Sequence, residues 1–142
     1  RSSDLCPFFV DNVPCYATGT GNQLTKIDLD LSSCKIVIVI PPIAVSTAMA
    51  YRLVHPRTPG NHLPEILKRA PGEWGGLIVN DFENPVFRTY PVIAGIKNTM
   101  LDAGAFYSSM SGSGSAVFGI FNELPQNLSG RFHPSCLVYL QE

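Results

Sequence analysis

The sequence has no excess of charge of either sign. Its 142 residues include ten Lys and Arg against eleven Asp and Glu, which gives a formal net charge of -1 at pH 7. Binding to a phosphate backbone or to an anionic lipid surface draws on a positive excess. We therefore expect neither a nucleic acid nor a membrane as a partner.

Long apolar runs are lacking too. The longest, residues 36–40, is about a quarter of the length that crosses a bilayer. The first residues, Arg-Ser-Ser-Asp at 1–4, lack the apolar core of a signal peptide. The sequence predicts neither a membrane span nor a targeting segment.

Closely spaced metal ligands are also missing. The cysteines lie far apart, with no Cys-x-x-Cys pair, at Cys6, Cys15, Cys34 and Cys136. None of the three histidines, His55, His62 and His133, lies near such a pair. Because a chain of this size does not need disulfides, we expect reduced, buried thiols in a cytosolic compartment and no metal site.

Apolar residues are plentiful, at 45% of the chain, which is enough for the core of one domain. Strand formers and turn residues alternate over residues 7–27, which predicts two or three short strands. Residues 35–40 form a β-branched run between Ser and Pro pairs. This run predicts a strand buried on both faces.

Two short helices are expected in the middle of the chain. Ser46 or Thr47 can cap a helix that runs through Val54, and Pro64 can open another that ends at Arg69.

A longer helical region follows. Asn80 stands three residues before Glu83, which predicts a capped helix start with Glu83 reaching back to the Asn80 amide. Pro91 interrupts the pattern, and a second apolar stripe, formed by Val92, Ile93, Ile96, Met100 and Leu101, ends at Gly104. We expect a helical hairpin or one kinked helix.

The remaining strands are predicted at residues 106–110, 116–121 and 136–140. Strands interleaved with two helical regions indicate an α+β fold. The architecture that we expect is a ferredoxin-like sandwich, with helices on one face of a mainly antiparallel sheet.

The segment Ser111, Gly112, Ser113, Gly114 and Ser115 is the sharpest local signal. Alternating glycines between two strands let amide groups face an anion without obstruction. Composition alone also fits a flexible hairpin turn. The segment lacks the Gly-Lys-Ser end of a P-loop, and no helix follows it as in a dinucleotide fingerprint.

Five stretches together resemble the C-terminal half of the GHMP kinases. They are Asn-Asp-Phe-Glu at 80–83, Gly-Ala at 104–105, Met-Ser-Gly-Ser-Gly-Ser-Ala-Val-Phe-Gly-Ile-Phe at 110–121, and, upstream, residues 16–24 and 41–51. Within that family the sequence is most similar to the branch that acts on 4-diphosphocytidyl-methylerythritol (CDP-methylerythritol). The resemblance extends over nearly the whole chain.

The resemblance implies an activity: ATP-dependent phosphorylation of the 2-hydroxyl of CDP-methylerythritol. This is a step of non-mevalonate isoprenoid (terpenoid) biosynthesis in a bacterial cytoplasm or a plastid, with Mg²⁺ arriving on the nucleotide. The family's nucleotide loop, Pro-x-x-x-Gly-Leu-Gly-Ser-Ser, is not in this sequence. We therefore expect residues 1–142 to be a single C-terminal, substrate-side domain that is inactive without an N-terminal ATP-binding domain.

The resemblance also suggests site residues. Asp4 corresponds to the catalytic aspartate, although one extra residue stands before Pro7, and an exposed terminal acid is the alternative. Thr47 would bond the edge of the cytidine base and Tyr51 would stack on it; the alternatives are a helix cap and a half-buried helix residue. Residues 111–115 would form the phosphate loop.

Other functions stay open. One is a non-catalytic ferredoxin-like module that binds a ligand or a partner, and another is a GHMP kinase for homoserine, mevalonate or a sugar. The glycine loop occurring together with residues 46–51 favours a kinase. Tyr51 favours cytidine, because an aliphatic substrate offers nothing to stack on.

Overall fold

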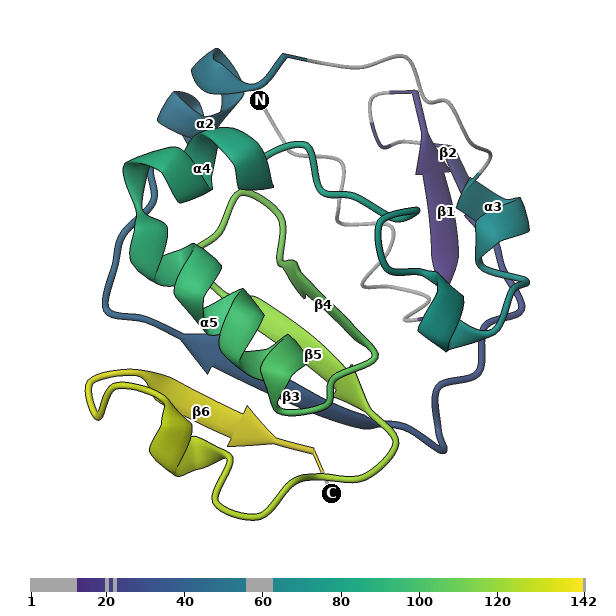
Figure 1. The fold of residues 1–142 in the computed structure, drawn as a ribbon. Coiled ribbons are helices and arrows are strands. Elements are labelled where there is room, and N and C mark those ends of the chain that lie inside the picture. The colour runs from purple at the N-terminus through teal and green to yellow at the C-terminus, as the bar shows by residue number, and fades with distance from the viewer. Residues whose placement is uncertain (1–12, 20, 22, 56–62, 142) are drawn as a thin grey trace.

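The main sheet has four strands and is antiparallel throughout. The structure, a computed structural model, describes residues 13–19, 21, 23–55 and 63–141 (Figure 1). Along the sheet the strands lie in the order β4 (Tyr107–Met110), β5 (Val117–Phe121), β3 (Lys35–Ile40) and β6 (Leu137–Leu140). The outermost strands are therefore β4 and β6.

Each crossover in the sheet passes over one intervening strand. The chain leaves β3, forms the helices and returns as β4 on the far side of β5. It then leaves β5, forms the short 3₁₀ helix η2 (Ser129–Arg131) and returns as β6 on the far side of β3. These two interleaved crossovers confirm the expected ferredoxin-like α+β architecture, with a second crossover of minimal helical content.

The helices follow β3 along the chain. They are α2 (Thr47–Leu53), α3 (Leu63–Ile66), η1 (Pro71–Glu73), α4 (Glu83–Thr89) and α5 (Pro91–Asp102). In Figure 1, α5 lies across one face of the sheet. No helix in the described ranges has the length and hydropathy that crossing a membrane requires.

A main core lies between that face and the helices. From the sheet it takes Val37, Val39, Val117 and Phe121, and from α4 and α5 it takes Val86, Ile93, Ile96 and Met100. Only Tyr90 separates α4 from α5, so the predicted interruption at Pro91 is confirmed. Two members of the predicted apolar stripe, Val92 and Leu101, are instead 58% and 40% exposed, because they point away from the sheet.

A second core covers part of the opposite face of the sheet. Its buried members are Ile66, Trp74, Tyr107 and Ile120. The Trp74 and Tyr107 rings meet edge to face, with 6.0 Å between centroids. The segment that covers this face contributes Ile66 and Trp74, which pack on Tyr107 of β4 and Ile120 of β5.

The prediction that β3 is buried on both faces is wrong. Val37 and Val39 have no exposed surface, but Ile38 is 39% exposed. Ile38 pairs with Tyr139 of β6, which is 54% exposed. The covering segment of the second core does not extend over this half of the face.

The predicted strands and α2 lie within one or two residues of the observed ones, but two helix limits differ. The helix opened by Pro64 ends at Ile66 rather than at Arg69, and the next begins at Glu83 rather than just after Asn80. Residues 7–27 contain the hairpin of β1 (Cys15–Thr18) and β2 (Gln23–Lys26), which confirms two of the predicted strands. The first part of that range, residues 7–12, lies outside the described residues.

Three of the cysteines lie in the described residues. Cys15, Cys34 and Cys136 are free thiols, and each is half-buried rather than buried as expected. They lie at strand ends or in connections, where one side of the residue stays open to solvent.

Candidate functional site

The glycine-serine segment forms a tight connection between β4 and β5. The Ser111 amide donates to the Ala116 carbonyl at 2.8 Å, and the Gly114 amide donates to the Ser111 carbonyl at 2.9 Å. Gly112 and Gly114 have φ values of +54° and +89°. Positive φ is the region that glycine enters without steric cost, so this backbone path depends on the two glycines.

The two glycines differ in their surroundings. A Cβ atom on Gly112 would meet nothing within 4 Å. A Cβ atom on Gly114 would lie 2.8 Å from Met110 Sδ and 3.6 Å from Val45 Cγ2. Gly114 is therefore constrained by packing as well as by backbone conformation.

Asn80 holds the start of this loop. Its Nδ2 group donates to the carbonyls of Met110 and Gly112, both at 2.8 Å, and its Oδ1 accepts from the Phe82 amide at 2.9 Å. The interpretation of Asn80 as a helix cap is thus corrected, because α4 begins only at Glu83. Both donors of the side chain serve the loop instead.

Glu83 holds the same point from the other side. Its carboxylate is buried, and Oε1 accepts from the Met110 amide at 2.8 Å and from the Ser109 hydroxyl at 3.0 Å. Its Oε2 accepts from Lys97 Nζ of α5 at 2.6 Å. The expected reach of Glu83 back to the Asn80 amide is therefore wrong: the first residue of α4 lies beside the outer strand β4 and bonds its edge.

The predicted substrate helix reaches the loop. Thr47 Oγ1 lies 3.2 Å from Ser113 Oγ, a contact across 66 positions of the chain. The helix cap is Ser46, whose hydroxyl accepts from the Met49 amide, so Thr47 is not the cap. The structure thus brings one predicted substrate residue together with the predicted phosphate loop.

Tyr51 lies one turn further along α2. It is 65% exposed rather than half-buried, and its ring meets the edge of Phe82 with 4.9 Å between centroids and 73° between planes. Phe82 lies between Asn80 and Glu83 in the chain, so Tyr51 packs on the segment that holds the loop. Most of the surface of Tyr51 is open to solvent.

A buried tyrosine lies in the strand beside the carboxylate. Burial raises the pKa of Tyr107; the Ser109 hydroxyl opposes the rise and the charge of Glu83 adds to it. The phenol donates to the Ile78 carbonyl at 3.4 Å. Tyr107 packs in the second core, so its role is structural.

Asp4 lies outside the described residues. Within the described ranges, no group of three or more His, Cys, Asp and Glu side chains could hold a metal ion. The sequence prediction missed Lys97, whose only signal was its position as the one charged residue within the apolar stripe of α5.

Comparison with known proteins identifies the family. The family model for the GHMP kinases C-terminal region matches residues 63–129, the part that carries Asn80, Glu83, Lys97 and the loop. This part of the chain is a GHMP kinase C-terminal domain. The helices α4 and α5 and the strands β4 and β5 all fall within it.

Relatives extend the match beyond this GHMP kinase domain. A protein of Parabacteroides distasonis named 4-diphosphocytidyl-2-C-methyl-D-erythritol kinase is 49% identical over 118 residues, which are 83% of this chain and 44% of the relative. A protein of the same name from Bacteroides fragilis is 44% identical over 117 residues, 82% of this chain and 43% of the relative. The chain thus spans less than half the length of the curated relatives that it matches.

Solved structures agree with this assignment. A crystal structure of 4-(cytidine 5'-diphospho)-2C-methyl-D-erythritol kinase matches with a TM-score of 0.67 and 26% identity, over 96% of this chain and 52% of that one. Homoserine kinase from Cytophaga hutchinsonii matches with a TM-score of 0.56 and 17% identity, over 84% of this chain and 44% of that one. At that identity the second likeness shows the fold alone.

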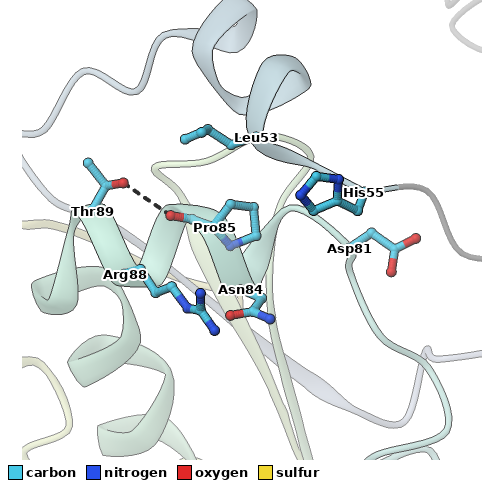
Figure 2. A pocket seen from close by; sticks show the side chains of 7 residues that line it. All are labelled: Leu53, His55, Asp81, Asn84, Pro85, Arg88 and Thr89. Atoms are coloured by element: carbon cyan, nitrogen blue, oxygen red, sulfur yellow. Dashed lines mark hydrogen bonds between the residues drawn. The ribbon is translucent and has the colours of Figure 1, made fainter.

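A cavity of about 380 Å³ lies apart from the loop, between α4 and the end of α2 (Figure 2). It is lined by Leu53, His55, Asp81, Asn84, Pro85, Arg88 and Thr89. Figure 2 shows Asn84 and Arg88 on the same side of α4, whereas Glu83 bonds β4. None of these lining residues is a predicted site residue.

Proposed function

We propose that this chain supplies the substrate-side, C-terminal domain, residues 1–142, of a kinase that phosphorylates the 2-hydroxyl of CDP-methylerythritol. The ATP-binding domain of that kinase would lie outside the chain. Support comes from the two bacterial relatives with this named activity and from the GHMP kinase domain itself. The reaction belongs to non-mevalonate isoprenoid biosynthesis in the cytoplasm or a plastid.

In this proposal each residue has a defined task. The oxygen of the substrate's 2-hydroxyl attacks the γ-phosphorus of ATP, the bond from that phosphorus to the β–γ bridging oxygen breaks, and ADP leaves. Asp4 orients the hydroxyl and takes its proton. Tyr51 stacks on the cytosine ring and Thr47 bonds its edge, which fixes the acceptor.

The loop of residues 111–115 would stabilise phosphoryl charge through backbone N–H groups. Magnesium enters the proposal as the ion that accompanies the nucleotide. The chain's own contribution is binding, orientation and one proton acceptor.

The contact between Thr47 and Ser113 carries the proposal. Phosphoryl transfer needs the acceptor and the transferring group within reach of one another. A 3.2 Å contact joins the helix assigned to the acceptor with the loop assigned to phosphate. A module that only bound a partner would not require these two segments to meet.

The test is an assay of the complete kinase that contains this chain, with ATP, Mg²⁺ and separate candidate acceptors. We expect phosphorylation of CDP-methylerythritol, detected as a new phosphomonoester by ³¹P NMR, and none of homoserine, mevalonate or galactose. Turnover of one of the other alcohols instead would replace the substrate but keep the kinase. A folded protein that phosphorylates none of them would favour the non-catalytic alternative.

A further inference from the structure

We propose that Asn80 is a positioning residue that gives the glycine loop its affinity for anions. It does so by engaging the carbonyls of Met110 and Gly112, which fixes the backbone that carries the unpaired N–H groups of the loop. This inference rests on the proposed function in one respect, the assignment of residues 111–115 to phosphate. Nothing in it depends on the identity of the alcohol substrate.

Four carbonyl groups in the loop or beside it are engaged within the protein, whereas those of Ser113, Gly114 and Ser115 accept no described hydrogen bond. Asn80 Nδ2 binds the carbonyls of Met110 and Gly112. The carbonyl of Ser111 accepts from the Gly114 amide, and that of Ala116 accepts from the Ser111 amide. Two of these four carbonyls therefore depend on a single side chain that comes from outside the loop.

Three amide groups of the loop are unpaired among the described residues. In the described part of the chain, no hydrogen bond engages the N–H groups of Gly112, Ser113 or Ser115. Unpaired backbone N–H groups are the donors that an anion prefers. The carbonyl of Gly112 and the N–H of Ser113 belong to one planar trans peptide unit and point in opposite directions, so binding that carbonyl to Asn80 directs the Ser113 N–H away from Asn80.

An asparagine is specifically suited to this task. Two donors on one planar group reach two carbonyls at 2.8 Å each, while its oxygen is fixed by the Phe82 amide. An aspartate of the same shape would have no donor and would place oxygen against oxygen. Glu83 fixes the Met110 amide independently, so the strand end remains anchored when Asn80 is changed.

The experiment measures anion binding at the loop directly. The ¹⁵N-labelled 142-residue chain is titrated with inorganic pyrophosphate while the amide resonances of Gly112, Ser113 and Ser115 are followed. Asn80→Asp is compared with Asn84→Asp, which adds the same charge at an exposed position of α4. We expect the three amides to shift in the parent and in Asn84→Asp, and the affinity to fall at least tenfold in Asn80→Asp.

A second variant guards against misfolding. Asn80→Ser keeps one donor and adds no charge, so we expect a smaller loss of pyrophosphate affinity with a dispersed, native spectrum. In the complete kinase the same variant should raise the KM for ATP and leave the KM for CDP-methylerythritol unchanged, which a general loss of stability would not do. A folded Asn80 variant with the parent's pyrophosphate affinity would overturn the proposal, as would a parent chain whose loop amides do not respond.

Failure of this inference can be told apart from failure of the proposed function. A kinase active on CDP-methylerythritol whose Asn80 variants keep full pyrophosphate affinity removes only the role of Asn80. Loop amides that respond to pyrophosphate through Asn80, in a protein without activity on CDP-methylerythritol, remove only the substrate assignment.

Discussion

At the scale of single residues, the two glycines of the loop differ in what surrounds them. Gly112 needs only its backbone freedom, whereas Gly114 also lies against Met110 and Val45. Met110 is almost fully buried, at 2% exposure, so its side chain has little room to move. Substitution should therefore separate a conformational cost from a packing cost.

We expect Gly114→Val to lower the melting temperature more than Gly112→Val. Both variants pay a strain of roughly 1–2 kcal/mol for a side chain at positive φ, but only Gly114→Val also displaces Met110. Ser113→Ala, which keeps the backbone, should be close to the parent. Thermal melts of the three variants test this, and equal losses at the two glycines would show that packing at Gly114 is unimportant.

Tyr51 offers a test of the cytidine assignment with little risk to folding. In the complete kinase, Tyr51→Ala should weaken binding of CDP-methylerythritol by about 1–3 kcal/mol, the usual contribution of one base–aromatic stack, and Tyr51→Phe should cost little. The matched control is Tyr139→Ala, which removes a tyrosine of similar exposure on β6. Calorimetry in which the Tyr51 and Tyr139 variants bind alike would return Tyr51 to a surface residue.

Tyr107 predicts a pH dependence of stability. Burial raises the pKa of its phenol above the ordinary value of 10.0, so the folded protein holds this proton more tightly than the unfolded chain does. Its contribution to stability is complete below pH 10 and is lost as the pH rises through the higher folded value. The free energy of unfolding should thus fall less steeply above pH 10 in Tyr107→Phe than in the parent.

The control for this prediction is Tyr139→Phe, since Tyr139 is 54% exposed on β6 whereas Tyr107 is buried. Urea unfolding at several alkaline pH values gives the slopes. If the free energy of unfolding falls with the same slope in Tyr107→Phe and in the parent, then folding does not raise the pKa of Tyr107.

At the scale of elements, one ion pair joins α4, α5 and the outer strand β4. Glu83 is the first residue of α4, Lys97 lies in α5, and the Met110 amide ends β4. The carboxylate is buried, while the Lys97 side chain is 25% exposed. Removing the acid therefore leaves more groups without a partner than removing the base does.

We expect Glu83→Ala to lower the free energy of unfolding by about 1.5–3 kcal/mol, as for loss of hydrogen bonds to a buried charged group. Lys97→Met should cost less, because the carboxylate keeps the Met110 amide and the Ser109 hydroxyl. Urea unfolding of both single variants and the double variant measures the coupling between them. If Lys97→Met lowers the free energy of unfolding as much as Glu83→Ala does, then Glu83 stabilises the fold through the ion pair and not through its bonds to β4.

The same elements show how far sequence reasoning reaches. The limits of β3 and a cap of α2 at Ser46 or Thr47 follow from local chemistry; the structure agrees with the first and shows Ser46 as the cap. The roles of Asn80 and Glu83 were misjudged because a capping box is a local pattern, whereas their partners in β4 and the loop lie 26 to 32 positions away. No periodicity in the chain encodes such a contact.

The candidate site, too, has parts that the sequence predicts and parts that it does not. The glycine loop was visible as a composition and α2 as a capped helix, but their contact at Thr47 and Ser113 needs the whole fold. The exposure of Ile38 was also missed, because a run of β-branched residues reports strand propensity and not what covers each face.

At the scale of the whole molecule, the chain spans 44% of its Parabacteroides relative. We expect the purified 142-residue chain to transfer no phosphoryl group from ATP to CDP-methylerythritol above background. The complete kinase should do so, because the nucleotide must be held against the acceptor by both domains. A coupled assay of ADP release, run on both proteins, tests this; turnover by the 142-residue chain free of contaminating kinase would place the whole active site within it.

The two borders of the main sheet are the edge strands β4 and β6, and they differ in whether their outer backbone groups are bonded. At the β4 border, Asn80 and Glu83 already bond the carbonyl and the amide of Met110. The β6 border carries Leu137, Tyr139 and Leu140, exposed by 56%, 54% and 46%, with no proline or charged residue in the strand. Uncapped apolar borders are where neighbouring molecules in a concentrated solution begin to aggregate by strand pairing. Because the other border of the main sheet is already bonded at Met110, we expect strand pairing between molecules to begin at β6 rather than at β4.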